Sequence, residues 1–284
     1  MTSGRPKRRP APPLLPGLAL AGVLVLTAFL ALPFIGLLAR VSPGLILQRL
    51  AEPSVQAALK LSLLTSFAAT AIVVVLGLPT AYLLATREFP GKRLLEVLID
   101  LPMVLPPTVA GFALLLAFGR MGLAGHLLSG IGVAIPFTTL AVVLAQIFMA
   151  APFFVSPARA GFARVDPRLL EVAATLGASE ARRFFRVMVP LSLPSLIAGV
   201  AMSAARSLGE FGATITFAGN LPGVTQTMPL AVYLELQSDL DTAVVLSILL
   251  LAFSFILLLG LRSAPAGWWG DRSFAPARGT TAAR

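Results

Sequence analysis

The chain of 284 residues contains no cysteine and a single histidine, and only 12% of its residues are charged. Without cysteine it forms no disulfide, thiol nucleophile, iron–sulfur cluster or cysteine zinc site. A single histidine cannot form a histidine-rich metal site, and none would be left over if it served a catalytic triad. We therefore treat His126 as a polar loop residue. The sequence therefore predicts no catalytic site, no metal site and no cofactor.

The scarcity of charge also excludes an ordinary soluble domain, in which about a quarter of the residues are charged. Apolar residues make up 57% of the chain, and the mean hydropathy is +0.90. A water-soluble domain of this size could not bury that much apolar surface. We therefore predict a membrane protein.

Uncharged runs are compared with the roughly 20 apolar residues that a spanning helix needs. The first run is too long for a signal-peptide core and is read as an uncleaved helix. Six spans result: Leu14–Ala39, Leu61–Thr86, Leu101–Gly119, Phe137–Val155, Val187–Ala205 and Thr242–Leu261. Prolines at 102, 106 and 107 should bend the third. The predicted fold is an all-α membrane domain over residues 14–262, with disordered tails at 1–13 and 263–284.

The distribution of Lys and Arg predicts the orientation of these spans. Seventeen lie in the N-terminal tail, the 87–96 loop, the 156–186 loop and the C-terminal end, against three in the alternate connections. We therefore expect both termini in the cytoplasm. The net charge of +10 is a topology signal and does not indicate a nucleic-acid partner.

The cytoplasmic loop over residues 156–190 contains the signals of two short helices joined at a corner. Asp166 is a good N-cap before Pro167, Gly177 suits the left-handed position that ends a helix, and Ser179 can cap the next helix. The first helix has an apolar face. That face suits either anionic lipid head groups or a groove on another protein, and physical chemistry alone does not choose.

The same loop carries a family signature. Glu171-Val-Ala-Ala-Thr-Leu-Gly177, followed by Val187-Met-Val-Pro190, resembles the EAA loop of ABC importer permeases. Glu171, Ala173, Gly177 and Pro190 match the signature, whereas Val172 replaces the usual alanine. The resemblance implies that this loop forms the coupling helix that fits a groove on a cytoplasmic ATP-binding subunit.

The chain has no nucleotide-binding loop of its own. Gly91-Lys92 is the nearest candidate, but Thr86 stands where the first glycine should be and Arg93 follows the lysine. ATP hydrolysis is therefore expected in a partner subunit, and this chain is not expected to be an enzyme.

The fifth span contains a face of small residues and two charges. Ser195, Gly199, Ser203 and Ser207 recur every four residues, which suits either a close helix–helix seam or the polar wall of a translocation path. Arg206 and Glu210 are the only charges well inside an apolar span. They either neutralise each other or present a cation to an anionic solute, and the two roles are compatible.

A second resemblance covers Ala205–Asn220, which is similar to permeases of the molybdate and sulfate branch of ABC importers. Leu221–Pro229 is most similar to the molybdate members. The resemblance implies a molybdate permease of type I fold in a bacterial plasma membrane, with sulfate, thiosulfate or tungstate as alternative substrates. It also implies a homodimer, an ATPase dimer and an extracytoplasmic molybdate-binding protein. Ser203, Arg206, Ser207, Glu210 and Thr214 are the candidate residues of the path.

Two other classes of function fit less well. An ion-coupled secondary transporter favours buried acidic residues and an internal repeat, whereas only the Arg206–Glu210 pair is charged there. An intramembrane enzyme needs a nucleophile and a base, and the serines of the fifth span have no neighbouring histidine or lysine.

Overall fold

The computed structural model describes residues 14–263, and every regular element within that range is helical. The predicted tails therefore lie outside the described residues, except for Ser263, which ends the last helix. The elements are α1 (Leu14–Leu38), α2 (Pro43–Leu50), α3 (Pro53–Thr86), α4 (Lys92–Val104), α5 (Pro107–Phe118), α6 (Leu123–Ser129), α7 (Thr139–Ala163), α8 (Pro167–Thr175), α9 (Glu180–Arg183), a π-helical segment (Phe184–Met188), α10 (Val189–Leu208), α11 (Gly212–Ala218), α12 (Met228–Ser238) and α13 (Leu240–Ser263).

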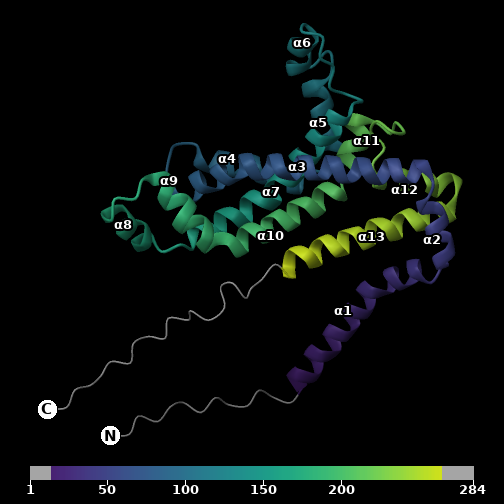
Figure 1. The fold of residues 1–284 in the computed structure, drawn as a ribbon, viewed down its shortest axis with the longest axis horizontal. Helices are drawn as coiled ribbons and strands as arrows, with labels where there is room; N and C mark the ends of the chain where they lie inside the picture. Colours follow the sequence, from purple (N-terminus) through teal and green to yellow (C-terminus); the bar gives the residue numbers. More distant parts are fainter. Residues whose placement is uncertain (1–13, 264–284) are drawn as a thin grey trace.

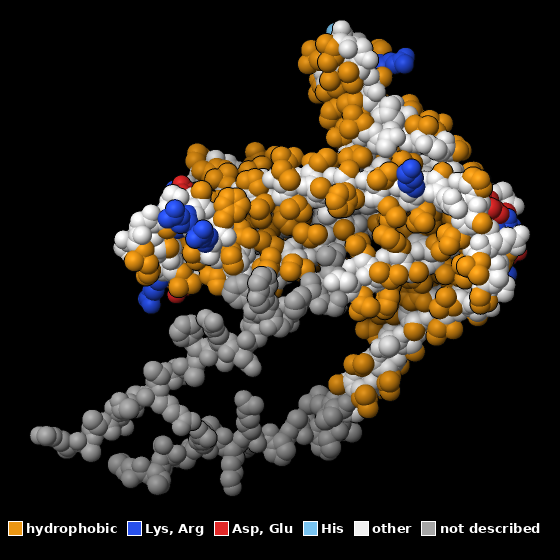
Figure 2. Space-filling model, in the orientation of Figure 1, with side chains coloured by type: hydrophobic (Ala, Val, Ile, Leu, Met, Phe, Trp, Pro, Cys, Tyr) orange, Lys and Arg blue, Asp and Glu red, His pale blue; other side chains and the backbone are white. Residues whose placement is uncertain are grey.

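Among these residues, six helical stretches are long and apolar enough to cross a membrane, which confirms the predicted number. They are Gly17–Leu38, Pro53–Thr86, Pro107–Leu128, Thr139–Ala163, Glu180–Leu208 and Leu240–Gly260. The apolar side chains form a broad band along the bundle, and most charged side chains gather at its two ends (Figure 2). This distribution is expected of a membrane protein, because charged side chains are costly in the hydrocarbon core of a bilayer.

The long helices α3, α4, α7, α10 and α13 run along the length of the molecule (Figure 1). The short helices α8 and α9 lie at one end, and α2 and α12 lie at the other. One buried cluster, which includes Val73, Phe154 and Leu196, joins α3, α7 and α10 near the α8 end. A second cluster, which includes Leu114, Met149 and Phe217, joins α5, α7 and α11.

The third predicted span is wrong in its boundaries. The run Leu101–Gly119 does not form one bent helix, because α4 ends at Val104 and α5 begins at Pro107. Pro106 and Pro107 lack the N–H groups that would continue the helix, so the helix ends before them. Residues Leu101–Val104 belong to α4, and α5 projects away from the long axis of the bundle (Figure 1).

The fourth predicted span also ends too early. Helix α7 continues through Pro152 and Pro157 to Ala163, eight residues beyond the predicted end at Val155. The first part of the loop predicted over 156–190 is therefore helical. The fifth span begins earlier than predicted, because helical structure is continuous from Glu180 through the π-helical segment into α10.

Candidate functional site

The corner between α8 and α9 has the predicted construction. Asp166 Oδ1 accepts a hydrogen bond from the N–H of Arg168 at 2.9 Å, and Pro167 occupies the first turn of α8. Gly177 has φ +79°, the left-handed conformation that glycine adopts without steric cost. Ser179 Oγ accepts from the N–H of Arg182 and caps α9.

Two backbone hydrogen bonds close the end of α8. The N–H of Ala178 donates to the carbonyl of Ala173 at 3.0 Å, and the N–H of Gly177 donates to that of Ala174 at 2.9 Å. This is the pattern in which a left-handed residue satisfies the last carbonyls of a helix. The corner is thus held by its own backbone.

The apolar face of α8 is exposed. Leu176 is 81% exposed, Val172 57% and Leu169 47%, and Glu171 is exposed beside them. No other part of the described chain covers these side chains. The face remains suited to either lipid head groups or a protein groove, as the sequence indicated.

Of the four candidate coupling residues, Glu171, Ala173 and Gly177 lie in or directly after α8, whereas Pro190 lies in the first turn of α10. A π-helical segment, which the sequence analysis did not anticipate, joins α9 to α10. Its Phe184 ring contacts that of Tyr82 on α3, with ring centroids 4.8 Å apart. The corner is thereby packed against the end of a spanning helix.

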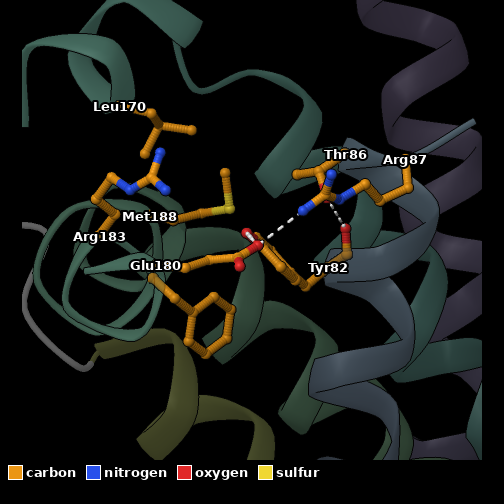
Figure 3. A pocket seen from close by; sticks show the side chains of 8 residues that line it. Tyr82, Thr86, Arg87, Leu170, Glu180, Arg183 and Met188 are labelled. Atoms are coloured by element: carbon orange, nitrogen blue, oxygen red, sulfur yellow. Dashed lines mark hydrogen bonds and ion pairs between the residues drawn. The ribbon is translucent and has the colours of Figure 1, made fainter. Parts of the chain in front are cut away.

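A second contact ties the corner to α3. Arg87 follows the last residue of α3, and its Nη2 donates to Glu180 Oε1 at 2.9 Å (Figure 3). Sequence reasoning missed this pair because 93 residues separate the partners, so no local pattern connects them.

Two of the four small residues of the fifth span, Ser195 and Gly199, pack against α7. A Cβ placed on Gly199 would lie 3.2 Å from Phe154, and one placed on Gly161 would lie 2.6 Å from the Cβ of Ser195. Ser203 and Ser207 are fully buried, and their hydroxyls have no hydrogen-bond partner among the described residues. In this conformation Gly199, Ser203 and Ser207 are buried inside the chain and form no open wall.

Arg206 and Glu210 form the predicted ion pair, with Nη1 of Arg206 facing Oε2 of Glu210. Glu210 does not lie within the helix, because α10 ends at Leu208 and α11 begins at Gly212. Its other oxygen, Oε1, accepts from the N–H of Ala213 at 2.7 Å. The Glu210 side chain is completely buried, whereas that of Arg206 is 23% exposed. Arg206 is therefore the more exposed member of the pair.

The short helices α5 and α11 pack closely together. Each follows an interruption of helical structure, α5 after the end of α4 and α11 after the end of α10. A Cβ on Gly111 would lie 2.5 Å from the carbonyl oxygen of Ala213, and one on Gly212 would lie 2.7 Å from Pro107. These glycines allow the two backbones to approach. Thr214, the last candidate path residue, is buried in the first turn of α11, and its hydroxyl has no partner among the described residues.

Sequence reasoning also missed a buried polar contact between α3 and α7. Gln146 is 1% exposed, and its Nε2 donates to Ser66 Oγ at 3.4 Å. One turn away on α3, Ser62 Oγ accepts from the N–H of Met228 at 2.7 Å. A glutamine inside an apolar span was the available signal, since buried amides need partners.

Within the described residues, no group of three or more His, Asp or Glu side chains is arranged to hold a metal ion.

Comparison with known proteins agrees with this arrangement. Residues 74–263 match the family model described as "Binding-protein-dependent transport system inner membrane component". The chain is 44% identical over 243 residues to the molybdenum transport system permease protein ModB of Mycobacterium tuberculosis, covering 86% of this chain and 90% of that protein. It is also 44% identical to ModB of Escherichia coli K12 over 190 residues, 66% of this chain and 82% of that protein.

A more distant relative is the probable sulfate transport system permease protein cysT of Chlorokybus atmophyticus, which is 36% identical over 82% of each chain. Among solved structures, a bacterial ABC transporter that imports alginate superposes with a TM-score of 0.70 at 16% identity, over 88% of this chain and 94% of that one. The MetNI methionine ABC transporter superposes with a TM-score of 0.58 at 17% identity, over 72% and 92%. The fold is thus that of an ABC importer permease.

The family match covers most of the chain, and the permease relatives are similar over most of their own length. This chain therefore belongs to the family of binding-protein-dependent transport system inner membrane components, as a multi-pass protein of the bacterial plasma membrane.

Proposed function

We propose that this chain is the membrane-spanning subunit of an ATP-driven importer that moves molybdate into the cytoplasm. The observation that carries the substrate is the 44% identity to a molybdenum permease over 90% of that protein's length. Sulfate, thiosulfate and tungstate are tetrahedral or similar oxyanions and remain the alternatives.

Arg206 is the residue proposed to meet the anion. It is a partly exposed cation in the last turn of α10, just before the break between α10 and α11. A charge inside the membrane must face protein or water. Glu210 keeps the guanidinium neutralised when no anion is present. Ser203, Ser207 and Thr214 would supply hydroxyls to the path when the α10–α11 break opens, because all three are buried and unpaired now.

The coupling role is assigned to the α8 corner. Glu171 and the exposed apolar face of α8 would enter a groove on the ATP-binding subunit, with Ala173 and Gly177 setting the shape of the corner. Pro190 lies where the corner joins α10, so a displacement of α8 would reach the helix that carries Arg206.

Two further partners follow from the exposed surfaces. No residue in the most apolar stretch of α1 is buried, and α1 stands apart from the main bundle (Figure 1). We propose that a second copy of this chain packs against it. At the end of the molecule opposite α8, helix α12 exposes Tyr233, Leu234 and Leu236 (Figure 1). These side chains would contact an extracytoplasmic binding protein.

Uptake by the reconstituted importer tests the function. Proteoliposomes containing the permease, its ATPase and its binding protein should accumulate molybdate in the presence of ATP, and tungstate and sulfate are added as competitors. Preferential competition by sulfate would reassign the substrate, and uptake driven by an ion gradient without ATP would favour a secondary transporter. Reporters inserted after Ala178 and after Gly223 should lie on opposite faces of the membrane, the first cytoplasmic.

A further inference from the structure

A cavity of about 330 Å³ lies where the α8–α9 corner meets the end of α3. We call it the corner pocket, and Figure 3 shows its lining side chains. They are Tyr82, Thr86, Arg87, Leu170, Glu180, Arg183, Phe184 and Met188. Because the lining comes from α3, α8, α9 and the π-helical segment, a molecule in the pocket would touch both a spanning helix and the proposed coupling element.

The pocket has more positive charge than its own carboxylate can neutralise. Glu180 is engaged by Arg87 at 2.9 Å and by the hydroxyl of Tyr82 at 3.5 Å. Arg183 has no ion-pair partner in the part of the chain that the structure describes, and its buried Nε has no hydrogen-bond acceptor there. Figure 3 shows the Arg183 side chain beside Leu170, across the pocket from Arg87. A buried guanidinium N–H normally has an acceptor, so the pocket is suited to an anion.

The position of the pocket indicates the source of that anion. Thr86 is the last residue of α3, and Arg87 is the first charge after the uncharged run Leu61–Thr86. The pocket therefore lies at the level of the lipid head groups. Its lining combines basic groups with the apolar side chains of Leu170, Phe184 and Met188, as expected of a site for a lipid rather than for a fully hydrated ion. Basic pockets at the cytoplasmic ends of spanning helices suit anionic head groups.

We propose that the corner pocket binds the phosphate of an anionic phospholipid from the inner leaflet, with Arg183 as the principal donor and Arg87 as the second. The bound lipid joins α3 to the α8–α9 corner and so stabilises the coupling element. This inference rests on the orientation given under the proposed function, in which this end of the molecule is cytoplasmic.

The test counts lipids that remain bound to the importer. The complex of full-length permease and ATPase is prepared in nanodiscs of equal phosphatidylcholine and phosphatidylglycerol, released into mild detergent, and examined by native mass spectrometry. Arg183→Gln removes the proposed donor. Arg182→Gln is the matched control, because it removes the same charge from the same helix at an exposed residue outside the pocket.

Wild type and Arg182→Gln should retain phosphatidylglycerol in preference to phosphatidylcholine, and Arg183→Gln should lose about tenfold of that preference, as expected for charge-assisted hydrogen bonds. Arg183→Lys should retain part of it, which separates loss of binding from misfolding. Equal losses in the two glutamine variants would overturn the proposal in favour of general surface charge.

Two other outcomes would also overturn it. Retention of inorganic phosphate or molybdate by the wild-type complex in phosphatidylcholine alone, lost in Arg183→Gln, would identify a free oxyanion as the ligand. Loss of the ATPase from Arg183→Gln in both lipids would identify a protein contact. Lipid retention is measured without transport, so failure of molybdate uptake would not change this result.

Discussion

Glu210 Oε1 accepts a hydrogen bond from the N–H of Ala213 at 2.7 Å, while Oε2 of the same carboxylate faces Arg206. One buried group therefore holds the start of α11 and neutralises the cation at the end of α10. A buried carboxylate is tolerated only when such partners are present. The connection means that a solute that attracts Arg206 also acts on the residue that anchors α11.

Glu210→Ala should lower the free energy of unfolding by about 3 kcal/mol, because it leaves the guanidinium of Arg206 without its partner. Glu210→Gln should cost less, since its amide oxygen can still accept from Ala213. Thermal unfolding in detergent measures both. Glu88→Ala is the control, because the Glu88 side chain is 89% exposed in its ion pair with Lys92 and should contribute at most about 1 kcal/mol. Equal effects at positions 88 and 210 would contradict the anchoring role.

Arg206→Ala leaves the buried Glu210 without its ion-pair partner, so it should destabilise the protein. The complexes that assemble should take up oxyanion about tenfold or more slowly, the loss expected from about 1.4 kcal/mol of anion stabilisation. Arg206→Lys should retain more activity, since the charge survives although the planar guanidinium does not. Initial uptake rates in proteoliposomes measure the effect, and basal ATP hydrolysis reports on assembly. Wild-type uptake by Arg206→Ala would show that the pair has a structural role alone.

The close approach of α5 and α11 predicts a large effect from a single methyl group. A Cβ at Gly111 would meet the backbone of Ala213 at 2.5 Å, and backbone cannot rotate away as a side chain can. Gly111→Ala should therefore destabilise the protein by about 1–3 kcal/mol. Gly44→Ala on α2, where a Cβ would meet nothing within 4 Å, is the matched control in the same unfolding measurement. A neutral Gly111→Ala would mean that the two short helices are not held at this distance.

The features that the sequence predicted well depend on residues close together in the chain. The α8–α9 corner follows from the cap at Asp166, the left-handed Gly177 and the cap at Ser179, each of which acts within a few residues. The Arg206–Glu210 pair is likewise local, because its members are four residues apart, although Glu210 lies just beyond the end of α10. In both cases local chemistry is sufficient.

The features that were missed depend on packing between distant segments. Hydropathy runs continue across the α4–α5 break, so they concealed the end of a helix at Val104 that the prolines suggested only as a bend. The Gln146–Ser66 and Arg87–Glu180 contacts join residues 80 and 93 positions apart. From the sequence alone, the face of small residues on α10 suits either packing against another helix or lining a path. In this conformation Gly199 packs against Phe154 of α7.

The contact between Arg49 and Asp239 predicts a pH dependence at the end of the molecule opposite α8. Hydrogen bonds from Thr242 lower the pKa of Asp239 below its ordinary value of 3.8, and Arg49 adds to the effect. A carboxylate with a depressed pKa in the folded state stabilises the protein above about pH 4, and that contribution is lost as the pH falls through its folded pKa. The unfolding temperature of wild type should fall by more than that of Asp239→Asn as the pH falls below about 4. Identical pH profiles would show that the contact contributes nothing.

The α8 corner provides the sharpest test of coupling, because its backbone geometry admits few residues. Gly177 has φ +79° with open space around its Cα, so Gly177→Val introduces no clash but forces a β-branched residue into the left-handed region, at a cost of more than about 1 kcal/mol. The corner should relax to another conformation and displace α8. Membrane insertion should be normal, whereas stimulation of ATP hydrolysis by the loaded binding protein should be lost. Gly91→Val is the matched control, since Gly91 has φ +85° and open space at the start of α4.

Glu171→Lys tests the same surface without changing the backbone. It reverses the charge beside the exposed apolar face of α8, so it should weaken contact with the ATP-binding subunit and reduce coupling while leaving thermal unfolding unchanged. If α8 lay on lipid head groups instead, an added positive charge would favour anionic lipid and coupling would persist. Stimulated ATP hydrolysis at the wild-type level in both Gly177→Val and Glu171→Lys would therefore assign the corner to the membrane surface rather than to the ATPase.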